Sequence, residues 1–131
     1  MGKLNLVTLI TVIVVQTVIG YLWYGPHLFG DVMKGHSIDV FKTDVMSIIF
    51  LVLTAYGMTH ILETHVKDSG AKDLSDGVTL GLKVGSFMLG FPVIMLLNLL
   101  GGYSLDAILV IFGHLVLITI GTTLVLIKTK K

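Results

Sequence analysis

Apolar residues run along this chain in four long stretches that are separated by short polar segments. The stretches cover residues 4–23, 45–62, 78–100 and 105–127, to within a residue or two. The first two contain no charged residue, and the third contains only Lys83. A helix needs about 20 mainly apolar residues to cross a bilayer. The pattern therefore predicts an all-α fold, a bundle of four transmembrane helices that forms one membrane domain over residues 1–131.

Composition narrows the class of protein further. Of the 131 residues, 54% are hydrophobic and only 13% are charged, whereas about a quarter of the residues in a soluble domain are charged. A soluble domain of this length would have too small an interior for so much apolar surface. The net charge is only +1, which argues against the clustered basic face that nucleic-acid binding needs. The chain has no cysteine, so disulfides, thiolate metal sites and cysteine nucleophiles are excluded.

Lysines near the ends of the stretches predict the orientation, because cytoplasmic loops are enriched in lysine. One side of the predicted bundle carries six of them, and the other carries two. The six are Lys3, Lys67, Lys72, Lys128, Lys130 and Lys131, and the two are Lys34 and Lys42. We therefore expect a multi-pass protein of the cell membrane with both termini in the cytoplasm.

The first external loop begins with a group of aromatic residues. Tyr21, Trp23 and Tyr24 lie where the first stretch ends, and amphipathic rings favour the headgroup layer. We interpret them as interface anchors. Apolar residues then recur at helical spacing, which predicts a short helix lying in the interface. These residues are Leu28, Phe29, Val32 and Met33.

The segment GYLWYGPHLFG at residues 20–30, with Gly90-Phe91 in the third stretch and His114 in the fourth, resembles a prokaryotic domain-of-unknown-function family numbered seventeen sixty-one. The resemblance covers nearly the whole chain, and the aromatic-Pro-x-Leu-Phe-Gly part is the most specific. It implies a small four-helix membrane architecture and supplies no activity, because none is established for the family. Members often carry an acidic residue one turn before the histidine, where this chain has Val110.

Each stretch also contributes one polar or irregular residue near the middle of the bilayer. At about 1.5 Å of rise per residue, Gln16, Thr54, Pro92 and His114 lie roughly 10–13 Å from the external ends of their spans. A proline within a helix adds polarity, because it leaves the carbonyl of Met88 without its usual donor. The sequence thus predicts a polar layer at the bundle centre, in which His114 faces the interior and meets Gln16.

Two interpretations of this layer remain open. Gln16 and His114 can be hydrogen-bonding groups that hold the helices together, each contributing about 1 kcal/mol. Alternatively, His114 can titrate in function, because the pKa of histidine lies nearest neutrality, and can relay a proton or bind a polar ligand. Matched depth and the intramembrane setting support both interpretations.

Glycines in the third and fourth stretches indicate close helix packing. Gly77, Gly81 and Gly85 repeat every four residues, which is the spacing that lets two helix backbones approach. Gly121 lies seven residues after His114 and so shares its helical face. The partner of the glycine face can be another span or a second copy, and the short hairpin between the last two stretches favours another span.

Charged residues near the cytoplasmic side offer two weaker candidates. Lys83 lies about 7 Å inside the third span, within reach of Glu63 as a charge pair. His60 and Glu63 stand three residues apart, a spacing that can ligate a metal, but neighbouring positions supply no third ligand. We therefore predict no metal and no cofactor.

Three function classes follow from these features. The first is a structural or accessory protein of the lipid bilayer that forms a homo-oligomer or joins a larger membrane complex. The second is a small transporter or proton-linked channel built around the polar layer at His114. The third is an enzyme, and the sequence argues against it, because it has no nucleophile motif, glycine-rich phosphate loop or paired intramembrane carboxylates.

Overall fold

A computed structural model shows an all-helical chain, and it describes residues 6–25, 28–31, 44–101 and 103–129. Within these residues, four helices are long and apolar enough to cross a membrane. They are Leu6–Trp23, Val45–Ser69, Leu74–Leu100 and Leu105–Thr129. The four-helix prediction is therefore confirmed. The predicted interfacial helix falls largely on residues outside the described part. Of its segment, the structure describes a turn at residues 28–29 and a helical conformation at residues 30–31.

Three of the four spans are continuous α-helices, and the third span along the chain is interrupted. The continuous helices are α1 (Leu6–Trp23), α3 (Val45–Ser69) and α6 (Leu105–Thr129). The third apolar stretch consists of α4 (Leu74–Val84), a π-helix η1 (Gly85–Gly90) and α5 (Phe91–Leu100).

The π-helix precedes a proline, and the proline explains it. Pro92 is the second residue of α5. It has no backbone N–H to donate to the carbonyl of Met88, and its ring would clash with that carbonyl in a regular α-helix. In the wider π turn, the N–H of Phe91 donates to the carbonyl of Ser86, five residues earlier. A π turn of this kind changes the direction of the helix at the point where the proline interrupts the regular ladder.

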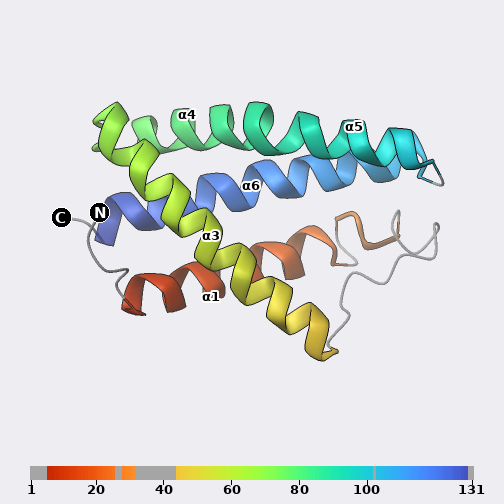
Figure 1. Cartoon of the computed structure of the whole chain (residues 1–131), viewed down its shortest axis with the longest axis horizontal. Helices are drawn as coiled ribbons and strands as arrows, with labels where there is room; N and C mark the ends of the chain where they lie inside the picture. Colours follow the sequence, from red (N-terminus) through yellow and green to blue (C-terminus); the bar gives the residue numbers. More distant parts are fainter. Residues whose placement is uncertain (1–5, 26–27, 32–43, 102, 130–131) are drawn as a thin grey trace.

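Helix α6 forms the centre of the molecule. It contacts α1, α3, α4, η1 and α5. Of the residues in its most apolar 18-residue segment, 39% are buried, whereas the corresponding share is 17–22% in the other three spans. Figure 1 shows α4, η1 and α5 running antiparallel to α6, with α1 on its other side and α3 crossing the bundle obliquely. The fold is thus one central helix with three helices packed around it.

Capping residues define where the helices begin and end. Asp44 accepts a hydrogen bond from the Ser47 N–H at the start of α3, and Asp73 accepts one from the Asp76 N–H at the start of α4. Gly70 ends α3 with a φ of 70°, a left-handed conformation that favours glycine. Helix α3 therefore continues seven residues past the apolar stretch, and the charged segment that follows residue 62 is mostly helical rather than a loop.

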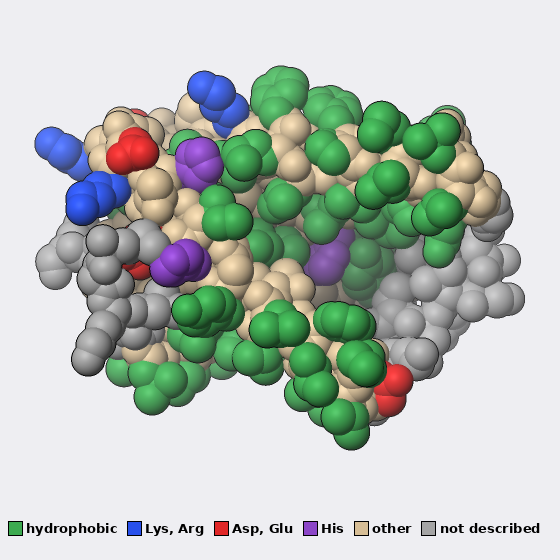
Figure 2. Space-filling view, viewed as in Figure 1, with side chains coloured by type: hydrophobic (Ala, Val, Ile, Leu, Met, Phe, Trp, Pro, Cys, Tyr) green, Lys and Arg blue, Asp and Glu red, His purple; other side chains and the backbone are tan. Residues whose placement is uncertain are grey.

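The two ends of the bundle differ in their connections and charge. The start of α1, the loop between α3 and α4 and the end of α6 lie at one end, and the turn between α5 and α6 lies at the other (Figure 1). We call these the lysine end and the hairpin end, because the lysines on the visible face lie toward the first (Figure 2). The described lysines are Lys67, Lys72, Lys83 and Lys128.

Candidate functional site

The polar interior of the bundle centres on a bond between α1 and α6. Gln16 is 5% exposed, and its Nε2 donates to the Oγ1 of Thr122 at 2.9 Å. The same amide nitrogen lies 3.5 Å from the sulfur of Met58 on α3. Three of the four spans therefore meet at Gln16, but its hydrogen-bond partner on α6 is Thr122 and not His114.

Buried threonines surround this bond. Thr59 on α3 and Thr119, Thr122 and Thr123 on α6 are fully buried. Each hydroxyl donates to the carbonyl four residues earlier in its own helix, at 2.6–2.7 Å. Among the described residues, no buried side-chain nitrogen or oxygen lacks a hydrogen-bond partner. This interior therefore satisfies its polar groups within the protein.

His114 lies closer to the hairpin end than Gln16 does, and it faces α1. Its ring meets the ring of Tyr24 edge-on, with the centroids 4.9 Å apart. A methyl group added at Gly20 would lie 3.7 Å from His114 Nε2, so the imidazole lies over the Gly20 backbone. Burial raises the pKa of Tyr24 to about 12, because a phenolate would lose its hydration there. The histidine thus faces a neutral phenol.

Two of the three predicted interface anchors pack against the protein. The Trp23 indole Nε1 donates to the Val110 carbonyl at 2.8 Å, and Tyr24 is only 8% exposed. Tyr21, at 68% exposed, alone faces outward. Trp23 and Tyr24 thus connect the hairpin end of α1 to α6.

The remaining members of the predicted polar layer lie on the outside. Thr54 and Pro92 are both exposed. Thr54 lines an apolar groove of about 260 Å³ between α3 and the α4–η1 segment. The structure brings Gln16 together with a threonine of α6, places His114 nearby toward the hairpin end, and leaves the other two outside this interior.

The predicted glycine face packs on α6 of the same chain. A methyl group at Gly81 would lie 2.5 Å from the Cα of Ile120, and one at Gly85 would lie 2.9 Å from the Cα of Val116. Gly77 meets side chains of α6, and Gly121 meets Ile19 and Val15 of α1. At Gly81 and Gly85 a methyl group would meet backbone atoms, so only glycine allows these two approaches without a shift of the neighbouring helix.

The predicted charge pair of Lys83 and Glu63 and the weak metal candidate at His60 and Glu63 lie on α3 and α4. Lys83 is exposed on α4, and Glu63 is partly buried on α3. The ring of His60 stacks on that of Tyr56, with the centroids 5.8 Å apart. The described residues contain no group of three or more histidine, aspartate or glutamate side chains that could hold a metal ion.

Sequence reasoning missed the threonines of α6, although a signal for them exists. Thr119, Thr122 and Thr123 stand three and four residues apart, so they share one helical face. Hydroxyls in a membrane helix can bond their own backbone, which makes such a face compatible with burial. The spacing could have predicted the buried side of the fourth span.

Comparison with known proteins found no matching family model, no similar curated protein and no similar solved structure.

Proposed function

We propose that this chain is a structural or accessory integral membrane protein that acts by assembling with further copies of itself or with other membrane proteins. The observation that carries the proposal is the closed polar interior. Gln16 is paired with Thr122, and the buried threonines bond their own helices. A pathway for a polar substrate would need polar groups that are free to exchange partners with it.

The outer surface supports the assembly part of the proposal. The first half of α3 is almost entirely exposed, and most of its side chains are large and apolar. Those exposed beyond 40% include Val45, Met46, Ile48, Ile49, Phe50, Val52 and Leu53. Lipid or another helix can cover such a surface equally well, because helix association in a bilayer depends on packing rather than on apolarity.

The size of the particle in mild detergent tests this proposal. We expect the protein to elute and weigh, after correction for detergent, as a multiple of its 14.2 kDa mass or with a co-purifying membrane protein. Phe50→Trp on the exposed half of α3 should alter that assembly. Phe87→Trp is the matched control, because Phe87 is also exposed, at 67%, but lies on η1. A lone monomer with no partner from native membranes would contradict the proposal.

The proposed topology places the lysine end in the cytoplasm of a cell-membrane protein. The support is the six-to-two lysine distribution, together with the common position of the two helix termini and the α3–α4 loop. Because the chain has no cysteine, Lys72→Cys and Lys34→Cys can be labelled singly in intact cells with an impermeant thiol reagent. We expect labelling at position 34 and none at position 72, and the reverse pattern would invert the topology.

A small proton-linked transporter is the second candidate function, and one observation favours it. His114 is only partly buried and contacts Tyr24. It therefore lies apart from the buried hydrogen bond between Gln16 and Thr122. His114→Gln should then abolish a pH-dependent flux in proteoliposomes while the helical signal stays unchanged. Gln16→Leu is the control and should retain the flux. Equal flux in wild type and His114→Gln would refute this alternative.

A further inference from the structure

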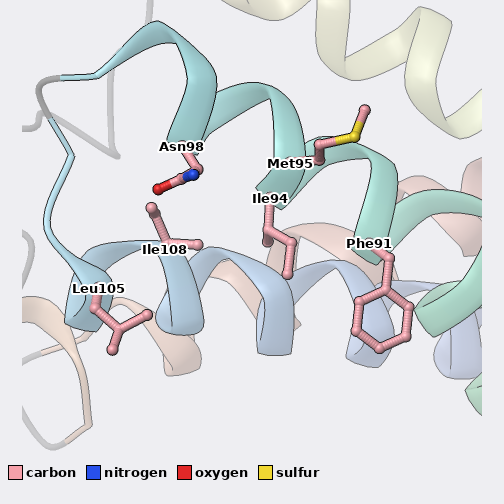
Figure 3. A pocket seen from close by; sticks show the side chains of 6 residues that line it. All are labelled: Phe91, Ile94, Met95, Asn98, Leu105 and Ile108. Carbon is pink, nitrogen blue, oxygen red and sulfur yellow. The ribbon is translucent and has the colours of Figure 1, made fainter.

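The hairpin between α5 and α6 opens toward its tip, and the opening forms a crevice. Its volume is about 370 Å³, and Figure 3 shows its walls. Phe91, Ile94, Met95 and Asn98 of α5 and Leu105 and Ile108 of α6 line it. Five of these six side chains are apolar, and Asn98 supplies the single amide.

Two features upstream explain why the helices separate. The π turn and Pro92 redirect the chain where α5 begins. The rings of Phe91 and Phe112 then stand between α5 and α6, with their centroids 5.2 Å apart. None of the residues of α5 is buried, whereas α4 buries three. The crevice is therefore a consequence of the backbone geometry and of two large rings.

The crevice is elongated along the helix axis and apolar at its inner end. From Phe91 to Asn98 the helix rises by about 10 Å, and Asn98 lies about 3 Å from the end of α5. Asn98 is exposed, and Figure 3 shows its amide directed between the two helices toward Ile108. Its side chain makes no hydrogen bond to another described residue.

We infer that this crevice binds one acyl chain of a membrane phospholipid, whose ester carbonyl accepts a hydrogen bond from the Asn98 amide. An amide at the edge of the hydrocarbon layer is costly unless it has a partner. The ester groups of a bilayer lie at the boundary between headgroups and hydrocarbon, near the depth of Asn98. The acyl chain then covers Phe91 and Ile94. This inference rests on the proposal that the four helices cross a bilayer.

Photolabelling with a phospholipid tests the inference. The full-length protein is reconstituted in phosphatidylcholine vesicles that contain a trace of phosphatidylcholine with a diazirine on one acyl chain. After illumination, mass spectrometry counts the adducts at each residue. Ile94 is only partly exposed and lines the crevice, whereas Leu96 is 54% exposed and does not. Bulk lipid contact predicts more label at Leu96, and a bound chain predicts more at Ile94.

Variants separate the apolar part of the site from its amide. Asn98→Leu should lower the ratio of label at Ile94 to label at Leu96 by about fivefold, as expected for the loss of one hydrogen bond. Ile108→Phe should lower it by filling the crevice. Leu109→Phe is the control, because Leu109 is 55% exposed and lies outside the crevice. An unchanged ratio in Asn98→Leu would overturn the role of the amide.

The outcomes also distinguish this inference from the proposed function. Label on all four helices with more at Leu96 than at Ile94 would overturn the acyl-chain site and leave the membrane protein standing. No label on any helix, with release of the chain from membranes by alkaline carbonate, would overturn the proposed function. Stronger label at Ile94 from a free diazirine fatty acid than from the phospholipid would overturn the assignment to phospholipid.

Discussion

The half of the bundle at the lysine end is packed more closely than the half at the hairpin end. Helix α4, at the lysine end, has three buried residues, whereas α5, at the hairpin end, has none, and α6 has buried residues in both halves. In the first half, Gly81 brings the backbone of α4 against that of α6. In the second, the contacts are made by rings, with Trp23 over Gly113 and Gly90 against Phe112.

The difference shows how helices associate when lipid surrounds them. Because lipid chains are as apolar as leucine, burying a large apolar side chain gains little over leaving it in the bilayer. Close backbone approach and internal hydrogen bonds then decide which faces pack, and these need small residues and hydroxyls. The lysine half has both along α4 and α6, whereas α5 carries large side chains and packs loosely.

The largest expected effect comes from breaking the glycine contact in the closely packed half. Gly81→Leu would place side-chain atoms where the Ile120 backbone lies, so we expect a loss of about 3 kcal/mol or more in the free energy of unfolding. Gly57→Leu is the matched control, because no atom lies within 4 Å of a methyl group there. Its effect should stay within about 1 kcal/mol. Circular dichroism during unfolding in detergent measures both, and equal losses would contradict the comparison.

The glycine pattern also illustrates what the sequence could predict. Hydropathy predicted four spans, because the thickness of the bilayer imposes a length that local sequence must meet. The four-residue glycine spacing predicted a closely packed face on the third span, because the helical period alone determines which residues share a face. Neither signal identifies the partner, and only the assembled structure shows that Gly81 meets Ile120.

Predicted pairing across the bundle failed where it depended on relative height. Counting from the hairpin end, Gln16 lies about 10 Å inside α1, whereas Thr122 lies about 25 Å inside α6. The estimate assumed that the ends of all spans lie in one plane. In the structure, α6 extends beyond the end of α1 (Figure 1), so a residue eight positions after His114 is level with Gln16. The relative height of two helices depends on contacts between residues that are distant in the sequence. It therefore cannot be deduced from the residues of each helix alone.

A smaller effect is expected in the loosely packed half, at its aromatic contact. Trp23→Phe removes the hydrogen bond to the Val110 carbonyl and part of the ring that covers Gly113. We expect a loss of about 1–2 kcal/mol in the free energy of unfolding. Tyr24→Phe removes only a hydroxyl and should change the stability by less than about 0.5 kcal/mol. If Trp23→Phe is as harmless as Tyr24→Phe, the aromatic contact does not hold this half together.

The smallest expected effect concerns the hydrogen bond between α1 and α6. Thr122→Val keeps the shape of the side chain but removes the oxygen that accepts from Gln16, so we expect a loss of about 1 kcal/mol. Thr17→Val is the control, because Thr17 is exposed and bonds only its own helix. Unfolding in detergent measures the losses.

A double-mutant cycle then tests the pairing itself. Gln16→Leu and Thr122→Val share one hydrogen bond, so their losses should fall short of additivity by at least about 0.5 kcal/mol. Gln16→Leu and His114→Ala should be additive within about 0.5 kcal/mol, because eight residues of helix separate His114 from Thr122 by about 12 Å. Coupling between Gln16 and His114, with none between Gln16 and Thr122, would restore the pairing predicted from depth. It would also mean that His114 holds the helices together as a member of the closed polar interior, and it would remove the observation that favours the transporter.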